Sequence, residues 1–264
     1  MPSRLDKRAP AIVLVVLAMV VLGALLASSG RGEVAATHDA TIKFDSSIFP
    51  RVLPRDGHAP VGIRIDGHVK AHKGHQVALT TLELAIHRAA DVNPVGLPVC
   101  DIASIEPSST AQALAACPGA QIGHGHVRAL LQFPEAEDIH FVGQVVVFNG
   151  QLEDGRKAIL LHVFNPLLRT SFVFPLTITH QPGRYHTVLK AHVRLDRWSS
   201  ITDFDIVLDR SYRYHGHVRS FLSAGCPAPK GFTVGISPFV VATLGFADGS
   251  KAKIPVVGSC KVTR

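Results

Sequence analysis

The sequence predicts an all-β fold, an antiparallel β-sandwich of jelly-roll or immunoglobulin-like type with one short helix. From residue 60 onward, apolar residues recur at every second position in short segments, which is the pattern of strands with one buried face. Gly, Pro, Asn and Asp separate these segments, and the stretches FNGQLEDGRKAILL and FADGSKAKI carry the N-G and D-G pairs of tight hairpins. Many short strands joined by such turns are typical of a sandwich.

The strands can be assigned one after another from this alternation. Val61, Ile63, Ile65 and Val69 lie on one face of the first predicted strand, and Leu82, Leu84 and Ile86 lie on one face of the second. Further strands are expected over residues 127–133, 139–148, 158–164, 172–178, 187–195, 204–218, 234–246 and 254–257. The stretches VVVF and AILLHVF are apolar on both faces, which predicts two central strands covered on both sides.

The N-terminus has the pattern of an export signal. Residues 11–27, AIVLVVLAMVVLGALLA, form an unbroken apolar run behind Arg4, Lys7 and Arg8. The stretches ASS and VAA, further along the chain, offer the small residues a signal peptidase accepts. The run also reaches the short end of what spans a bilayer as a helix, ~17–25 residues. Cleaved signal peptide and retained membrane anchor therefore both remain open.

The domain organisation is set by this segment. We expect residues 1–29 to be the signal peptide or N-terminal membrane anchor, residues 30–40 a flexible leader, and residues 41–264 a single β-sandwich domain. The protein is then exported and lies outside the cell or at the cell envelope, where it is either released or held by residues 11–27.

The charge balance limits the partners. The formal net charge is +7, and loss of residues 1–29 would leave +5. Such a balance suits an anionic envelope polymer or a membrane surface. Scattered solvated charges are the alternative, because no run of five or more like charges occurs. Nucleic acid is not expected as the partner of an exported chain.

Four cysteines, Cys100, Cys117, Cys226 and Cys260, predict two disulfides in an exported chain. Three connectivities are possible, and locality favours Cys100–Cys117 and Cys226–Cys260. The first bond would staple the end of a helix over residues 110–116, which Ser109 and Gln112 begin with a capping box. No pair has C-x-x-C spacing, which argues against redox catalysis and against a thiolate zinc site.

Three groups of histidines are candidates for metal binding. The stretch YRYHGHVRS contains His215 and His217, GHGHVRALLQF contains His124 and His126, and IRIDGHVKAH contains His68 and His72. An H-x-H pair on a strand places both imidazoles on one side, a geometry that zinc and copper sites use with a third ligand from a neighbouring strand.

The phase of the strands favours another interpretation of these histidines. In residues 204–218 the apolar residues occupy the even positions, so His215 and His217 share a polar face with Arg213 and Arg219. A cation there would meet repulsion, and each imidazole must be neutral to bind a metal. We therefore expect solvated polar faces and no cofactor, with zinc or copper as the alternative. Protonation of the 15 histidines below about pH 6.5 is a third possibility, since it would strengthen binding to anionic surfaces.

Sequence motifs of common enzymes are missing. The chain contains no G-x-S-x-G, H-E-x-x-H, Walker loop or G-x-G-x-x-G after a strand. Asp203, Asp205 and Asp209 would share one outward face, as carboxylates of a glycosidase or a calcium site could. The glycine-punctuated acidic loop of calcium sites is absent, so a solvated strand face is the preferred interpretation. We expect no catalytic residues.

Five stretches carry a resemblance to a known group of proteins. They are LTTLELAIHRAADVNPVGLPVC, EPSSTAQALAACPGAQIG, VFNG, SFLSAGCPAPKGF and GSCKV. Together they resemble a group of uncharacterised exported actinobacterial proteins over most of residues 45–264, with SAGCPAPKGF as the most specific element. The resemblance implies one exported domain with two cysteine pairs and carries over no site residue. In that group basic or small residues often occupy the positions of His124, His126, His215 and His217, which weakens the metal interpretation.

The sequence thus predicts an exported cell-envelope protein that acts as a non-enzymatic binding or structural module. The alternatives are a secreted hydrolase and a histidine-dependent metal-binding protein. A deep pocket that joins acids or histidines of different strands would favour the alternatives, and flat faces of mixed charge would favour the binding module.

Overall fold

The computed structural model describes residues 33–263 except residues 39, 73–77, 133, 134, 136 and 194–198. The chain divides into two units, Met1–Arg31 and Gly32–Arg264. The predicted export segment at residues 11–27 lies outside the described residues, so every described strand and helix belongs to the second unit.

The described chain is built almost entirely of strands. The strands are β1 (Glu33–Ala36), β2 (Ala40–Phe49), β3 (Val52–Leu53), β4 (Ala59–Ala71), β5 (Leu79–His87), β6 (Ala90–Val92), β7 (Cys100–Asp101), β8 (Gln121–Leu131), β9 (Ile139–Gln151), β10 (Lys157–Asn165), β11 (Thr170–His180), β12 (Tyr185–His192), β13 (Ser199–Leu208), β14 (Ser211–Tyr214), β15 (His217–Ser220), β16 (Leu222–Ala224), β17 (Val234–Phe246) and β18 (Lys251–Val262). The helices are α2 (Ile102–Ile105) and α3 (Thr110–Ala116).

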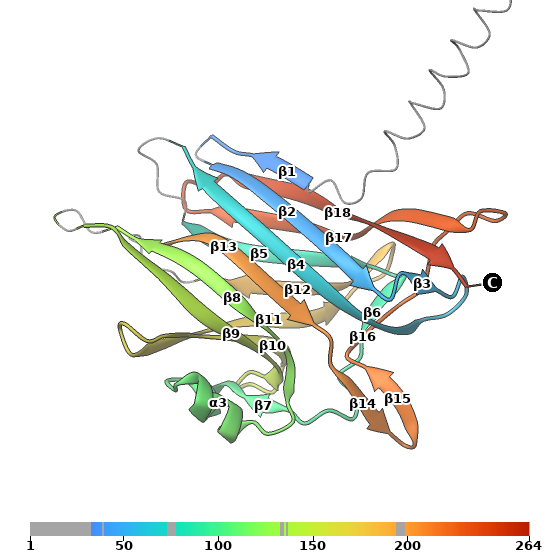
Figure 1. Ribbon diagram of the computed structural model, residues 1–264, viewed down its shortest axis with the longest axis horizontal. Helices are drawn as coiled ribbons and strands as arrows, with labels where there is room; N and C mark the ends of the chain where they lie inside the picture. The colour runs from blue at the N-terminus through green and yellow to red at the C-terminus, as the bar shows by residue number, and fades with distance from the viewer. Residues whose placement is uncertain are drawn as a thin grey trace, which may run out of the picture. The chain divides into compact units, whose positions relative to one another are not determined.

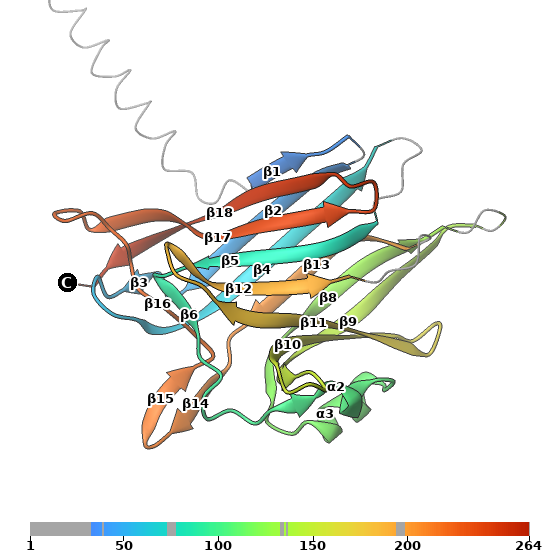
Figure 2. The ribbon, with the colours of Figure 1, turned by 180° about the vertical axis from the view of Figure 1, so that it is seen from behind.

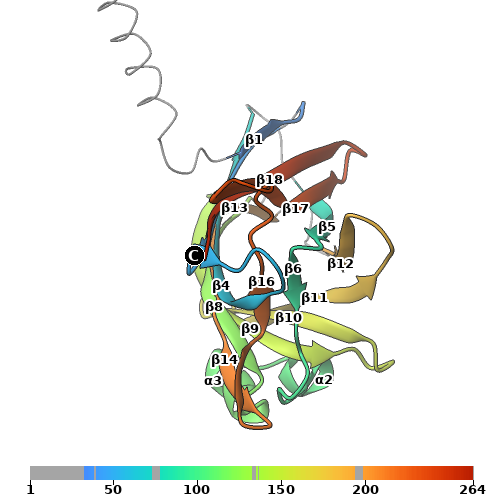
Figure 3. The same ribbon diagram turned by 90° about the vertical axis from the view of Figure 1, so that its right-hand side faces the viewer.

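One continuous, mainly antiparallel sheet forms the framework (Figures 1 and 2). Its main path runs β1-β2-β4-β13-β8-β9-β10-β11-β12-β5-β17-β18-β3. The sheet curls, so that β18 returns close to β1 and β2 (Figure 3). The prediction of an all-β antiparallel fold with a short helix is confirmed. The facing layers are halves of one curled sheet, because strand pairing continues through each neighbour along this path.

The apolar faces of the strands fill the interior of this curl. The buried residues of the largest cluster include Val127, Val145, Val147, Ile159, Val163, Leu176, Leu189 and Phe221. A second cluster joins β2 to β17 and β18 through residues such as Ile42, Ala242 and Ile254. Contact between these strands across the interior explains why the two ends of the sheet approach each other.

β9 and β10 are buried on both faces, as their sequences predict. Val145 and Val147 face the interior, whereas Val146 and Phe148 pack on the outer face against Ile105 and the cysteines of the cap. We use "the cap" for α2 and α3 together with the Cys100–Cys117 disulfide. The cap keeps water from the outer face of both strands, which is why they can be apolar throughout.

The helix and both disulfides were predicted correctly. Ser109 accepts a hydrogen bond from the backbone nitrogen of Gln112, and the Gln112 side chain accepts one from the backbone nitrogen of Ser109. This reciprocal pair is the predicted capping box at the start of α3. Cys100 is bonded to Cys117 and Cys226 to Cys260.

Two strand predictions need correction. The leader expected over residues 30–40 contains β1, which pairs with β2, because its short extended stretch gains the backbone hydrogen bonds of an existing edge. The single strand expected over residues 204–218 is divided into β13, β14 and β15. The chain turns back at His215 and Gly216, which have φ values of 48° and 78°. Val218, expected to point inward, is therefore 61% exposed.

A buried histidine ties the cap to the sheet. His162 on β10 is 0% exposed, and its Nε2 donates to the backbone oxygen of Ser108 at 3.0 Å. Its Nδ1 is buried without a hydrogen-bond partner in the described part of the chain. Burial lowers the pKa of His162, since the charged imidazolium would lose its hydration, and the hydrogen bond to Ser108 opposes this only partly. The ring is therefore neutral near pH 7.

This burial predicts a loss of stability in acid. Because the pKa of His162 is lower in the folded protein than its ordinary value of 6.5, the unfolded chain takes up the proton first as the pH falls. The free energy of unfolding should then decrease below about pH 6.5, by at most about 1.4 kcal/mol per pH unit for one proton. In His162→Gln this dependence should become shallower, as measured by urea unfolding at several pH values. His217→Gln, at an exposed position, is the control, and an unchanged slope in His162→Gln would contradict the assignment.

Candidate functional site

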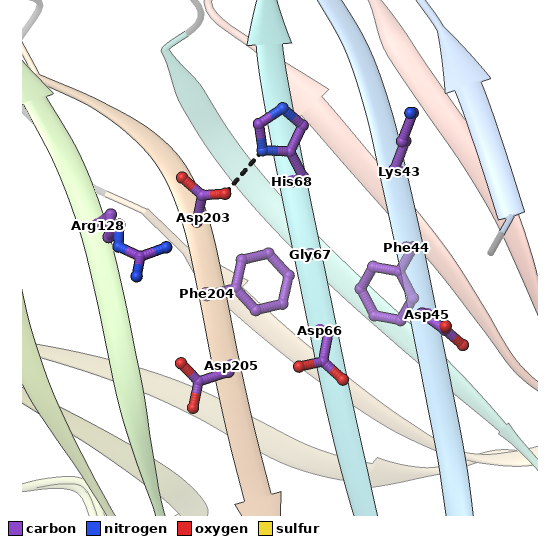
Figure 4. A pocket seen from close by; sticks show the side chains of 10 residues that line it. All are labelled: Lys43, Phe44, Asp45, Asp66, Gly67, His68, Arg128, Asp203, Phe204 and Asp205. Atoms are coloured by element: carbon purple, nitrogen blue, oxygen red, sulfur yellow. Dashed lines mark hydrogen bonds and ion pairs between the residues drawn. The ribbon is translucent and has the colours of Figure 1, made fainter.

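An open hollow of about 450 Å³ lies where β2, β4, β13 and β8 run side by side (Figure 4). The residues that line it are Lys43, Phe44, Asp45, Asp66, Gly67, His68, Arg128, Asp203, Phe204 and Asp205. Seven of these ten carry side chains that can be charged, and four of the seven are aspartates. The strand register explains how residues far apart in the sequence meet here.

The charged side chains form two rows across the four strands. Residues directly opposite each other on antiparallel strands point to the same face. The register therefore aligns Lys43, His68, Asp203 and Arg128, which we call the lysine–arginine row. Two residues further along, it aligns Asp45, Asp66, Asp205 and His126, which we call the aspartate row.

Aromatic side chains pack beneath the floor between the rows. Phe44, Gly67 and Phe204 are aligned by the same register and alternate with the charged residues, so they belong to the opposite face of the sheet. The rings of Phe44 and Phe204 meet edge to face with centroids 5.9 Å apart. A Cβ on Gly67 would overlap the ring of Phe204. Glycine at this position therefore lets Phe204 cover the floor from within.

Hydrogen bonds join the histidines of the rows to the aspartates of β13. His68 Nδ1 lies 2.7 Å from Asp203 Oδ1, and His126 Nδ1 lies 3.4 Å from Asp205 Oδ2. Partial burial would raise the pKa of Asp203, but hydrogen bonds from His68 and Thr202 and the charges of His68 and Arg128 outweigh it, so this pKa is lowered. Asp203 is therefore a stable anion in the hollow.

Asp66 has the opposite behaviour. Burial raises its pKa, the charge of Arg64 opposes the rise, and the neighbouring carboxylates of Asp205 and Asp45 add to it. Two aspartates of adjacent strands in the same hollow thus have pKa values shifted in opposite directions, upward for Asp66 and downward for Asp203. The aspartate row holds a carboxyl group that takes up a proton more readily than an ordinary aspartate does.

The predicted histidine candidates are not brought together. His124 and His126 lie on the outer face of β8 and are exposed, as predicted. His215 and His217 are not a pair on one strand face, because His215 occupies the turn after β14 and His217 begins β15. Within the part of the chain that the structure describes, no group of three or more His, Cys, Asp or Glu side chains is arranged to hold a metal ion.

Two of the three acidic candidates lie on one strand face, and the third does not. Asp203 and Asp205 share the outer face of β13, as their alternation predicts, and each binds a histidine of a neighbouring strand. Asp209 lies beyond the last residue of β13, so it does not extend that strand face. Lys43 and Asp45 were missed, although the alternation in TIKFDSSIF could have revealed β2.

A second polar cluster, also missed from the sequence, joins the β11–β12 hairpin to the middle residue of β6. His186 Nε2 lies 3.5 Å from Asp91 Oδ1, and Thr187 Oγ1 donates to the same oxygen at 3.5 Å. The rings of His180 and His186 are stacked with centroids 6.2 Å apart. Residues this far apart in sequence give no local signal, since only the sheet pairing brings them together.

No protein-family model, curated protein or solved structure matches the chain. Among the described residues, none of the helices has the length and apolar content needed to cross a membrane. The fold and the two disulfides define a class, an all-β domain suited to an oxidising, extracellular environment.

Proposed function

We propose that this protein is an exported, non-enzymatic binding module of the cell envelope, and that the outer face of β2, β4, β13 and β8 is its binding surface. The observation that carries the proposal is the pair of charged rows. They lie on an open sheet face, their side chains come from four strands, and the lysine–arginine row sets one carboxylate among basic groups.

Such a surface suits recognition of a partner with many polar and charged groups. Opposite charges at fixed spacing give register and specificity to an encounter, and open faces accept extended or flat partners. An enzyme would instead be expected to enclose its reacting groups and exclude water. The partners we propose are an anionic envelope polymer or a membrane surface. Their anionic groups would contact Lys43 and Arg128, and their hydroxyl or ammonium groups would contact the four aspartates, which outnumber these two cations.

The test is binding of the purified exported protein to isolated cell envelopes, measured by co-sedimentation. The variant Lys43→Glu/Arg128→Glu reverses both cations of the lysine–arginine row and should weaken binding at least about tenfold, since two favourable charge contacts become repulsive. Both residues are exposed, so the free energy of unfolding should change by no more than about 1 kcal/mol. Lys157→Glu, an exposed lysine of β10, is the matched control and should bind normally.

The same protein preparations can distinguish the binding module from the alternative class, a secreted hydrolase. A secreted hydrolase would turn over ester, glycoside or phosphate model substrates and would lose this activity in Asp66→Asn or His68→Ala. Such activity, together with envelope binding that the charge reversal leaves unchanged, would overturn the proposal.

A further inference from the structure

The start of the C-terminal hairpin exposes a group of apolar side chains outside the hollow. Phe232, Val234, Ile236 and Val257 are 64%, 47%, 73% and 42% exposed. We call these four residues the hairpin patch. β17 and β18, which carry three of them, run side by side toward the right-hand end of the view in Figure 1, where β18 ends near the C mark.

The register shows that the exposure is built into the strands. Val234 lies opposite Lys261, and Ile236 lies opposite Ser259, whereas the alternate residues Gly235, Ser237 and Phe239 are buried. The outward positions of this segment are thus apolar where polar residues would be expected on a solvated face. Exposed large apolar side chains that lie together mark an interaction site.

The loop that presents Phe232 is held in place. Arg55 donates from Nη1 to the backbone oxygens of Ala228 at 2.6 Å and Pro229 at 2.8 Å, and from Nη2 to that of Phe232 at 2.6 Å. The buried Cys226–Cys260 disulfide fixes the start of the same loop to β18. Little conformational freedom then remains to be lost when Phe232 enters an interface.

Positive charges surround the hairpin patch. Lys230 in the loop and Lys261 on β18 are exposed, and Arg51 lies just before β3, which pairs with the end of β18. Tyr185 donates to the backbone oxygen of Pro238 at 3.5 Å, and the guanidinium of Arg184 lies 5.8 Å from the Tyr185 ring. From residue 226 to residue 264 the sequence contains one acid, Asp248, which lies in the turn at the other end of the hairpin.

We infer that the hairpin patch docks on an anionic lipid membrane. This rests on the proposed function, in which the protein works at the envelope, and it adds a second contact surface, separate from the outer face of β2, β4, β13 and β8, with the lipid membrane as its partner. Aromatic and aliphatic side chains would enter the boundary between headgroups and acyl chains, and the lysines would lie at the level of the anionic headgroups. Charge complementarity favours a lipid surface, because each lysine near an anionic membrane adds a favourable interaction and the one acid of residues 226–264, Asp248, lies at the other end of the hairpin.

The test places a tryptophan in the patch of the exported protein, with whichever N-terminus export leaves. Ile236→Trp is made in a Trp198→Phe background and mixed with phosphatidylcholine vesicles that contain or lack phosphatidylglycerol. With phosphatidylglycerol, the emission of the new tryptophan should shift to the blue and be quenched by brominated lipid. Val142→Trp is the matched control, since Val142 is 56% exposed on β9, which four strands separate from β17 in the sheet order. It should keep the emission of a water-exposed tryptophan.

The emission and quenching of the new tryptophan report only where the side chain at position 236 lies. A retained N-terminal anchor could hold the protein on a vesicle, but it would not by itself place this side chain in the lipid. Lys230→Glu/Lys261→Glu in the Ile236→Trp protein should abolish the quenching and leave the melting temperature unchanged. If the tryptophan stays in water on both kinds of vesicle while the protein binds isolated envelopes, the membrane inference is wrong and the proposed function stands. Binding to purified anionic polymer but not to vesicles would also overturn it. If envelope binding is absent altogether, the proposed function fails as well.

Discussion

Replacing Cys226 and Cys260 together by alanine should lower the free energy of unfolding by about 3.8 kcal/mol, the value that chain entropy gives for a loop of this length. The two cysteines are separated by 34 residues, and both are buried at 0% and 3% exposure. Their bond joins the loop before β17 to the end of β18, near the backbone hydrogen bond from Cys226 to Pro54. Without this bond, the unfolded chain gains conformational entropy and the folded state does not, so the free energy of unfolding falls.

The second disulfide provides the comparison. Cys100 and Cys117 are separated by 17 residues, so Cys100→Ala/Cys117→Ala should cost about 0.6 kcal/mol less than the first pair. Both variants should be measured by urea unfolding under non-reducing conditions, with equal m-values. A larger loss from the shorter loop would show that packing of the cap, and not loop closure, dominates.

Gly125→Ala should destabilise the protein by about 3 kcal/mol, at the upper end of what overpacking usually costs. A Cβ on Gly125 would overlap the backbone oxygen of Asp205 and would lie 2.9 Å from the Cα of Ile206. A backbone atom cannot move aside as the end of a side chain can. The pairing of β8 with β13 would have to open, which would also move Arg128 and His126 away from Asp203 and Asp205, their neighbours in the two rows.

His124→Ala is the control in the same GHGH stretch. His124 alternates with the glycines and is exposed on the outer face of β8, so its loss should change the free energy of unfolding by no more than about 0.5 kcal/mol. If both substitutions lower the free energy of unfolding equally, the backbone of β13 can move away from a Cβ at position 125 at little cost. Thermal or urea unfolding, with envelope binding as a second measurement, separates these outcomes.

The GHGH stretch of β8 shows which structural features can be predicted from the sequence and which cannot. Alternation alone predicts that Val127 and Ala129 point inward and that His124 and His126 point outward, and the structure confirms both. It does not predict that β13 lies between β8 and β4, since strand order depends on packing over the whole sheet. The hydrogen bonds of His68 to Asp203 and of His126 to Asp205 depend on that order, so the residues that line the hollow could not be brought together from the sequence alone.

The error over residues 204–218 has a local cause. Alternation continues through the segment as though it were one strand, but it does not record where the chain turns back. At His215 the backbone has a positive φ, which few residues other than glycine adopt, and Gly216 follows it. The same H-G dipeptide at His124 and Gly125 lies inside β8, so the dipeptide alone could not have located this turn.

The pairing of β18 bears on whether copies of this protein can associate through their sheet edges. In the described strands, β18 pairs with β17 along most of its length, but with β3 only at Lys261 and Val262. Its remaining edge lies near β1 and β2 without pairing with them, and unpaired edge groups are the usual route to edge-to-edge aggregation. That edge carries Lys251 and Lys253, and Pro255 has no N–H to give to a ladder. The protein therefore protects an open sheet edge by charge repulsion and by a missing donor.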